Sequence, residues 1–227
     1  MEDSKVFHVF PNEPRPPYVD RAEGVYIYTK DGQKLLDITS GGNHYAVLGW
    51  AHPEVNKAME IQIKKFGHMD YKLWSNENTE ELADVLISRA EHGLDRVYFG
   101  GNAGSEACEV AMKMSYQVHH DTGKTKKIWF ISREQSYHGS TADALALGER
   151  PNLEFFRQML SPYRARIPMH HPLYLQRDGE TIDDYARRSA KELEDKILEI
   201  GPDYVCGFVG ETIMGGLVGD VPPAPNY

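Results

Sequence analysis

Apolar residues recur with two different periods along the chain, and these periods predict an alternation of helices and strands. Four stretches have apolar residues at helical spacing: 53–66, 78–86, 105–119 and 182–200. Three short apolar runs have the composition of strands: 96–99, 127–131 and 204–209. Strands that alternate with helices favour right-handed crossovers between parallel strands. The pattern therefore predicts an α/β fold with a largely parallel sheet and flanking helices.

Local signals predict where these helices begin and end, and their spacing predicts which faces are buried. Pro53 suits a first helical turn, and Gly67 suits the residue that ends the same helix. Asn78 followed by Glu81 predicts a capping box for the second helix. Leu82, Val85 and Leu86 are expected to face inward. Two further sets lie at helical spacing along one face of their helices: Ala107, Ala111, Met114 and Val118; and Ile182, Tyr185, Ser189, Leu193 and Ile197 or Ile200.

The first fifty residues have a different composition. Four prolines favour an extended arm with little regular structure: Pro11, Pro14, Pro16 and Pro17. Asp31-Gly32 lies between two alternating apolar segments, which is typical of a hairpin turn. A glycine-led loop then runs from Ser40 through Gly41 to Tyr45. We therefore predict a division into residues 1–50, which hold arm, hairpin and loop, and residues 51–227, which hold the α/β domain.

Composition excludes several classes of protein. Hydrophobic residues make up 41% of the chain, enough for a core, and the formal net charge of −9 argues against nucleic-acid binding. Cys108 and Cys206 are the only cysteines and are expected as buried thiols in a reducing compartment. Met1–Ser4 is acidic, unlike a signal peptide, and no apolar stretch has membrane-spanning length. These features predict a soluble, cytoplasmic protein with no membrane partner.

The candidate chemistry begins with a glycine-rich loop at residues 100–107, between a predicted strand and a predicted helix. The backbone amides of Gly104 and Ser105 would stand at the positive end of the helix dipole, which favours an anion. The spacing does not fit a dinucleotide fingerprint, and no Gly-Lys-Ser/Thr sequence of a P-loop follows. The loop thus predicts a phosphate site, with a simple turn as the alternative.

Two further candidates follow other predicted strands. Tyr137 and His138 come after residues 127–131, and Glu211 comes after residues 204–209. Tyr137 would suit stacking on a planar ring, or it is a rim aromatic; His138 is a general base or a satisfied polar residue. Glu211 is either desolvated for function or paired with an arginine. Because open α/β sheets bind ligands at the carboxyl ends of their strands, we expect these residues to converge on one cleft.

A metal site is not predicted. The tandem pairs His119-His120 and His170-His171 lack a carboxylate or cysteine at the spacing that zinc requires.

Five ordered blocks carry a resemblance to a known family: 26–41, 49–55, 99–113, 136–140 and 210–223. From about Tyr18 onward the chain resembles the N-terminal half of the class III, PLP-dependent aminotransferases. The resemblance implies the large domain of the fold type I PLP-dependent transferases. Residues 51–227 would form part of that PLP-binding domain, truncated before the Schiff-base lysine and the small C-terminal domain.

The resemblance also implies roles for individual residues. Gly104 and Ser105 would hold the phosphate of pyridoxal 5'-phosphate, and Tyr137 would stack on its ring. His138 and Gly139 would shape the adjoining wall, with Glu211 on the substrate side. Ser40, Gly41 and Tyr45 would line the substrate entrance, across the interface of a homodimer. The substrates would be an amine or amino acid and a 2-oxo acid.

The chain departs from the family pattern in several places. Ala103 stands where the family usually has serine, Cys108 where asparagine is common, and Thr212 where proline is usual. No lysine lies in a motif that matches the Schiff-base lysine, so the catalytic residue is absent and transamination by these 227 residues is not expected. We also expect the helix over 182–200 to leave its apolar face bare, because the parts that would cover it are missing.

Three hypotheses remain open from the sequence. The chain is part of a transaminase, or it is a non-catalytic module that uses the same fold for binding or heterodimerisation. The third is a decarboxylase or racemase, because one fold supports several chemistries.

Overall fold

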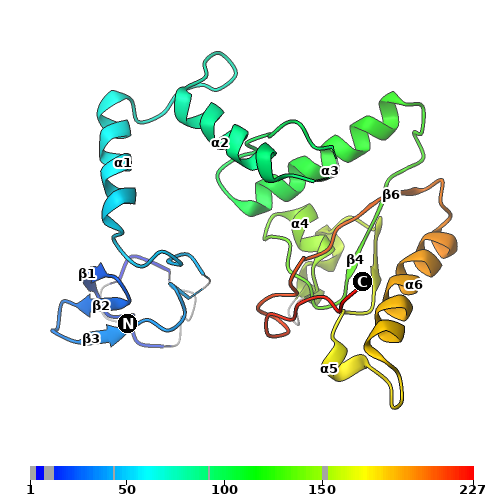
Figure 1. Cartoon of the computed structure of the whole chain (residues 1–227). Coiled ribbons are helices and arrows are strands. Elements are labelled where there is room, and N and C mark those ends of the chain that lie inside the picture. Colours follow the sequence, from blue (N-terminus) through cyan, green and yellow to red (C-terminus); the bar gives the residue numbers. More distant parts are fainter. Residues whose placement is uncertain (1–3, 8–12, 43, 92, 150–152) are drawn as a thin grey trace. The chain divides into compact units, whose positions relative to one another are not determined.

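A computed structural model describes residues 4–7, 13–42, 44–91, 93–149 and 153–227 (Figure 1). Two compact units make up the chain, Met1–Arg89 and Ala90–Tyr227. The predicted division into residues 1–50 and 51–227 is not the boundary between these two units, and it stays a prediction. Of the four prolines in the predicted arm, Pro11 lies outside the described residues, and the other three have no regular structure.

The first unit contains a small antiparallel sheet of three strands in the order β1-β2-β3. Its strands are β1 (Val19–Glu23), β2 (Tyr26–Thr29) and β3 (Lys34–Leu36). The β2–β3 turn contains Asp31 and Gly32, and Gly32 has a φ of 90°, which glycine adopts without strain. The predicted hairpin is therefore confirmed. Strand β1 was not predicted, since it follows the prolines directly.

Two helices follow in the same unit, α1 (Pro53–Lys65) and α2 (Glu77–Arg89). The predicted cap at Asn78 is wrong. Asn76 caps α2 instead, because its Oδ1 accepts from the backbone amide of Thr79 at 3.1 Å. Neither helix contains a buried residue. The expected inward face of α2 is 45–48% exposed at Leu82, Val85 and Leu86, so this prediction is wrong as well.

The second unit is built on a parallel sheet in the order β5-β4-β6. Its strands are β4 (Trp129–Arg133), β5 (Arg164–Ile167) and β6 (Val205–Phe208). Its helices are α3 (Gly104–Asp121), α4 (Ala142–Leu147), α5 (Pro172–Leu175), α6 (Ile182–Ile200) and the 3-10 helix η1 (Leu153–Met159). The predicted α/β fold with a parallel sheet is confirmed. Strand β5 and the short helices were not predicted.

Successive residues of the central strand point to opposite faces of the sheet, and each face has its own helices (Figure 1). Phe130 packs with three residues of the α3 and α4 side: Met112, Leu147 and Cys206. Ile131 packs with Ile167 and Val205 on the other side, where α6 supplies Leu193, Ile197 and Ile200. The predicted face of α6 is thus mostly buried, and the expectation that it would be bare is wrong.

Two further predictions about the second unit are corrected. Residues 96–99 are not a strand: a strand exists only through pairing, and no described strand pairs with them. The helically spaced side chains of α3 are not its buried side: the helix buries Met112, and Met114 and Val118 are 49% and 61% exposed. A hydrogen bond helps to set which side of α3 faces the sheet: the Nε2 of His119 is bonded to the carbonyl oxygen of Cys206 on β6 at 2.9 Å. Cys108 and Cys206 are both free thiols.

Candidate functional site

The start of helix α3 has no side-chain cap of its own. Ala103 occupies the N-cap position and has no side chain to accept a hydrogen bond. Glu106 accepts from the amide of Asn102 at 2.6 Å and lies beside Gly101, whose φ of 122° favours glycine. The first amides of a helix have no acceptor within the helix, so those of Gly104 and Ser105 are suited to an anion.

The loop after β4 packs directly on this helix start. The amide of Ser140 donates to the Ser105 hydroxyl oxygen at 3.0 Å. A Cβ placed on Gly139 would lie 2.7 Å from the Ser105 Oγ and 2.8 Å from its Cα. Glu109 adds a second tie, because its Oε1 accepts from the amide of Asp143 at 3.0 Å, at the start of α4. The structure therefore brings together the two loops that the sequence singled out.

Tyr137 and His138 lie in this loop with different exposure. Tyr137 is 42% exposed, and His138 is 9% exposed. Burial lowers the pKa of His138, so its imidazole stays neutral near physiological pH. Its Nε2 is buried and has no hydrogen-bond partner among the described residues. An unpartnered buried nitrogen is costly, so the Nε2 of His138 is available to a polar ligand.

Glu211 follows β6 and lies beside the same loop. Its Oε1 accepts a long hydrogen bond from the amide of Gly215 at 3.4 Å, and its Oε2 is buried without a partner in the described chain. Burial raises the pKa of Glu211, and the nearby charge of Asp220 adds to this rise. The backbone amides of Gly215 and Tyr137 partly offset it. The residues that the sequence predicted after three different elements are thus neighbours.

A cavity of about 220 Å³ lies at the carboxyl ends of β4 and β6. Of the predicted site residues Glu211 lines it, whereas Gly104, Ser105, Tyr137 and His138 do not. Arg133, the last residue of β4, also lines it and is only 2% exposed. Arg133 was not predicted from the sequence. Arg133 ends an apolar strand just as Glu211 follows one, but only the structure shows that Arg133 is buried.

Lys127, which follows α3, lies far from this group. Lys127 donates from its Nζ to the carbonyl oxygens of Pro202 and Val205, at 2.6 and 2.9 Å. It precedes β4, so it lies at the amino edge of the sheet, whereas Tyr137 follows the carboxyl edge. The six residue steps from 127 to 133 correspond to about 20 Å of extended chain. Lys127 thus has a structural role and does not reach Tyr137.

The tandem histidines are also engaged in structural contacts. His170 is bonded through its Nδ1 to the Ser189 hydroxyl at 3.0 Å, and its Nε2 accepts from the amide of Ala224 at 2.9 Å. No cluster of His, Cys, Asp or Glu in the described ranges has the makings of a metal site. None of the described helices is long and apolar enough to cross a membrane.

The predicted entrance residues lie in the unit of residues 1–89. Asp37 organises their loop, since its Oδ2 accepts from the amide of Gly41 and from the Trp50 indole, both at 2.7 Å. Hydrogen bonds from Thr39 first, and then from Trp50, lower the pKa of Asp37 to about 2. Ser40 has a positive φ of 50°, and Tyr45 is 79% exposed. Their role at a substrate entrance stays a prediction.

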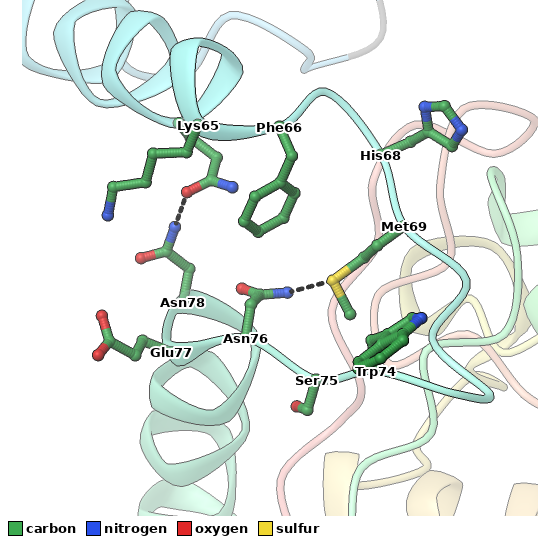
Figure 2. A pocket seen from close by; sticks show the side chains of 10 residues that line it. Lys65, Phe66, His68, Met69, Trp74, Ser75, Asn76, Glu77 and Asn78 are labelled. Carbon is green, nitrogen blue, oxygen red and sulfur yellow. Dashed lines mark hydrogen bonds between the residues drawn. The ribbon is translucent and has the colours of Figure 1, made fainter.

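A second cavity, of about 450 Å³, lies in the same unit between the end of α1 and the start of α2. Figure 2 shows Phe66, Met69 and Trp74 around it, with Asn76 donating from Nδ2 to the sulfur of Met69 at 3.5 Å. Aromatic and amide groups of this kind suit a planar apolar group. None of these residues was predicted from the sequence to belong to a functional site.

Comparison with known sequences assigns the chain to a family. The sequence profile of the family described as aminotransferase class-III matches residues 10–227. An uncharacterized aminotransferase of Schizosaccharomyces pombe is 38% identical over 223 residues, covering 98% of this chain and 48% of that protein. Gamma aminobutyrate transaminase 2 of Solanum lycopersicum is 33% identical over 216 residues, covering 93% and 46%.

Solved structures agree with this assignment. An omega-aminotransferase from Paracoccus denitrificans superposes with a TM-score of 0.86 at 28% identity, covering all of this chain and 50% of that one. The PMP-bound aminotransferase from Vibrio fluvialis gives 0.84 at 30% identity, covering 93% and 46%. The chain belongs to the class III aminotransferases, a PLP-dependent family. It spans about half the length of the relatives and structures that it matches.

Proposed function

We propose that this chain supplies the phosphate and ring-stacking side of a PLP site in a transaminase. The reaction would move an amino group between an amine or amino acid and a 2-oxo acid. The proposal rests on the contact between Ser105 and the loop of Gly139 and Ser140. This contact holds the loop that contains Tyr137 next to the uncapped start of α3. One relative is named a gamma aminobutyrate transaminase, which supports this substrate class.

The residues present fit the phosphate group of such a cofactor. The Ser105 oxygen accepts from Ser140, which leaves its O–H free to donate to a phosphate oxygen. A Cβ built on Gly104 would meet nothing within 4 Å, so the space above the helix start is open. Ala103 removes one hydroxyl donor that the family usually has, and the backbone amides then carry more of the phosphate binding.

The other residues would orient the ring and the substrate. Tyr137 would cover one ring face, a stacking contact of about 1 kcal/mol beyond area burial. His138, neutral and buried, would close the wall beside it. The raised pKa of Glu211 suits a carboxyl that faces a substrate amine and holds or releases a proton there. When bound, PLP supplies an electron sink.

The test is a titration of the 227-residue chain with PLP, followed by absorbance. We expect Ser105→Ala and Tyr137→Ala each to weaken binding about five-fold, which corresponds to about 1 kcal/mol per contact. Ser115→Ala is the matched control, because Ser115 lies on the same helix and its hydroxyl donates only to the Ala111 carbonyl oxygen. An equal loss in Ser115→Ala, or no loss in the other two, contradicts the proposed site.

Borohydride reduction and peptide mapping separate a catalytic chain from a binding module. No lysine here lies in a catalytic motif, so we expect scattered labelling of lysines and no measurable transamination. Stoichiometric labelling of one lysine together with turnover would overturn this expectation. A homodimer and a cytoplasmic location remain part of the proposal. One relative, from rice, is named mitochondrial, which makes location a separate measurement.

A further inference from the structure

The start of helix α4 is capped from another helix rather than by its own N-cap residue. Thr141 occupies the N-cap position, but its side chain makes no cap hydrogen bond, and its Oγ1 is buried without a partner among the described residues. The Oε1 of Glu109, on α3, accepts instead from the amides of Asp143 at 3.0 Å and Ala144 at 3.4 Å. These are the second and third helical residues, whose amides an N-cap side chain usually satisfies.

A cap from a distant part of the chain fixes more than a local cap would. The hydroxyl of an N-cap residue stabilises only its own helix. Glu109 lies 34 residues before Asp143 and belongs to α3, so its hydrogen bond also fixes where α4 begins relative to α3. Asp143 makes another contact outside its helix, because its Oδ1 accepts from the Nη2 of Arg164 on β5 at 2.9 Å. The start of α4 is thus held between α3 and the sheet.

Two residues of α3 hold the loop that leads into α4. Ser105 and Glu109 are four positions apart, so they lie on the same face of α3, one turn from each other. Ser105 accepts from the amide of Ser140, and Glu109 accepts from the amides of residues 143 and 144. Helix α3 therefore offers its first amides to a ligand and holds the neighbouring loop one turn later.

The ring of Tyr137 depends on these contacts for its position. Because Tyr137 is 42% exposed, packing alone does not fix the ring. On one side of it, the buried Ser136 donates from Oγ to the carbonyl oxygen of Arg133 at 2.6 Å. The amide of Tyr137 itself interacts with the carboxylate of Glu211. On the other side, the loop is held at Ser140 and then at the start of α4.

We propose that Glu109 is a positioning residue of the PLP site: by capping α4, it holds the Tyr137 loop where one ligand can reach both the ring and the first amides of α3. The inference rests on the proposed function, which assigns the ring and the phosphate contacts. Glu109 does not touch the ligand. Its contribution is the distance between the stacking side chain and the phosphate site, which a cap within the loop could not set.

A double-mutant cycle on PLP binding tests the proposal. Glu109→Ala should weaken binding about five-fold, the loss expected for Tyr137→Ala, because a displaced ring no longer stacks. Glu109→Ala/Tyr137→Ala should also lose about five-fold, whereas independent effects would multiply to about 25-fold. Glu109→Gln keeps an oxygen that can accept from both amides, so it should restore most of the affinity. Inorganic phosphate, which cannot stack, should bind equally well to Glu109→Ala and to the unmodified chain.

Thr181→Ala is the matched control for loss of a helix cap. Thr181 caps α6, on the other face of the sheet, by accepting from the amide of Asp184 at 3.2 Å. Its removal should cost stability and leave PLP affinity unchanged. Equal losses of affinity in Glu109→Ala and Thr181→Ala, multiplied losses in the double variant, or a matching loss of phosphate affinity overturns the proposal.

A local cap separates positioning from simple stabilisation. Adding Thr141→Asp to Glu109→Ala supplies an N-cap side chain to α4, which also supports folding if Glu109→Ala alone folds poorly. We expect this variant to regain thermal stability, followed by circular dichroism, but not PLP affinity. Recovery of both would show that Glu109 only stabilises α4, and it would overturn the positioning role.

Hydrogen exchange without cofactor distinguishes this outcome from failure of the proposed function. The amides of residues 140–144 should exchange about ten-fold faster in Glu109→Ala, because a hydrogen bond to a charged group is lost, and at an unchanged rate in Thr181→Ala. Unchanged exchange in Glu109→Ala overturns the positioning role even where PLP binds. Faster exchange in a chain that does not bind PLP overturns the cofactor site and supports the role of Glu109 in holding the loop.

Discussion

The two units of the chain differ in how far they bury apolar side chains that have the same helical spacing. In residues 90–227, Ile131, Leu147 and Tyr185 are at most 1% exposed, and helix α6 buries the face that its spacing predicts. In residues 1–89, helices α1 and α2 have equally regular spacing but no buried residue, and Thr29 is the one buried position among those described. Periodicity thus predicts that a helix forms, whereas burial depends on a partner surface.

The largest expected difference comes from removing the same side chain in each unit. Ile131→Ala should lower the free energy of unfolding by about 3–4 kcal/mol, because Ile131 is fully buried and its loss leaves a cavity. Ile63→Ala in α1 should change it by less than about 0.5 kcal/mol, since Ile63 is 69% exposed. Urea unfolding followed by tryptophan fluorescence measures both. Equal losses would break the comparison between the units.

Acid should destabilise the second unit through His170. Burial first, and then the charges of Arg133 and His171, lower the pKa of His170 from 6.5 to about 4. Between these two pH values His170 is protonated in the unfolded chain but neutral in the folded chain. The free energy of unfolding therefore falls as the pH drops from 6.5 to about 4. The full difference corresponds to about 3 kcal/mol.

Unfolding at several pH values in this range tests the acid effect. His170→Gln should flatten the dependence, while His68→Gln, which changes an exposed residue of the first unit, should leave it intact. An unchanged slope in His170→Gln would rule out His170 as its source.

A smaller effect is expected from two glycines with positive φ. Gly139→Ala should cost about 2 kcal/mol and weaken PLP binding, because the new Cβ would lie within 2.8 Å of Ser105 and Ala144. Gly42→Ala in the first unit, with a φ of 88° and no atom within 4 Å, should cost only the strain of about 1 kcal/mol. Unfolding and PLP titration of both variants measure the difference. A larger cost at Gly42 would contradict the crowding argument.

Sequence alone predicted much of this fold because its signals were local. The hairpin at Asp31-Gly32 and the bounds of α6 follow from turn chemistry and helical spacing, and both are confirmed. Two predictions were wrong: a strand at residues 96–99, and burial of the helically spaced side chains of α3. Strand formation depends on pairing with another strand, and the buried side of a helix depends on what packs against it. No described strand pairs with residues 96–99, and the hydrogen bond between His119 and Cys206 helps to set the buried side of α3.

Only some residues of the candidate site could be predicted from the sequence. Motif and strand position indicated Gly104, Tyr137 and Glu211, and the structure brings their loops together. Arg133 was missed because a charged residue at the end of an apolar strand usually reaches solvent. Only the fold reveals that it is 2% exposed beside a cavity.

The close approach of Gly139 to Ser105 has a consequence for how this protein varies among its relatives. Because a single Cβ at position 139 already conflicts with the Ser105 backbone, a larger side chain there cannot be accommodated by a change at position 105 alone. The distance between the loop of Gly139 and the start of α3 at Ser105 therefore cannot accommodate a larger side chain at position 139. Among functional relatives, position 139 should admit only glycine, and position 105 should admit only small residues that keep a hydroxyl.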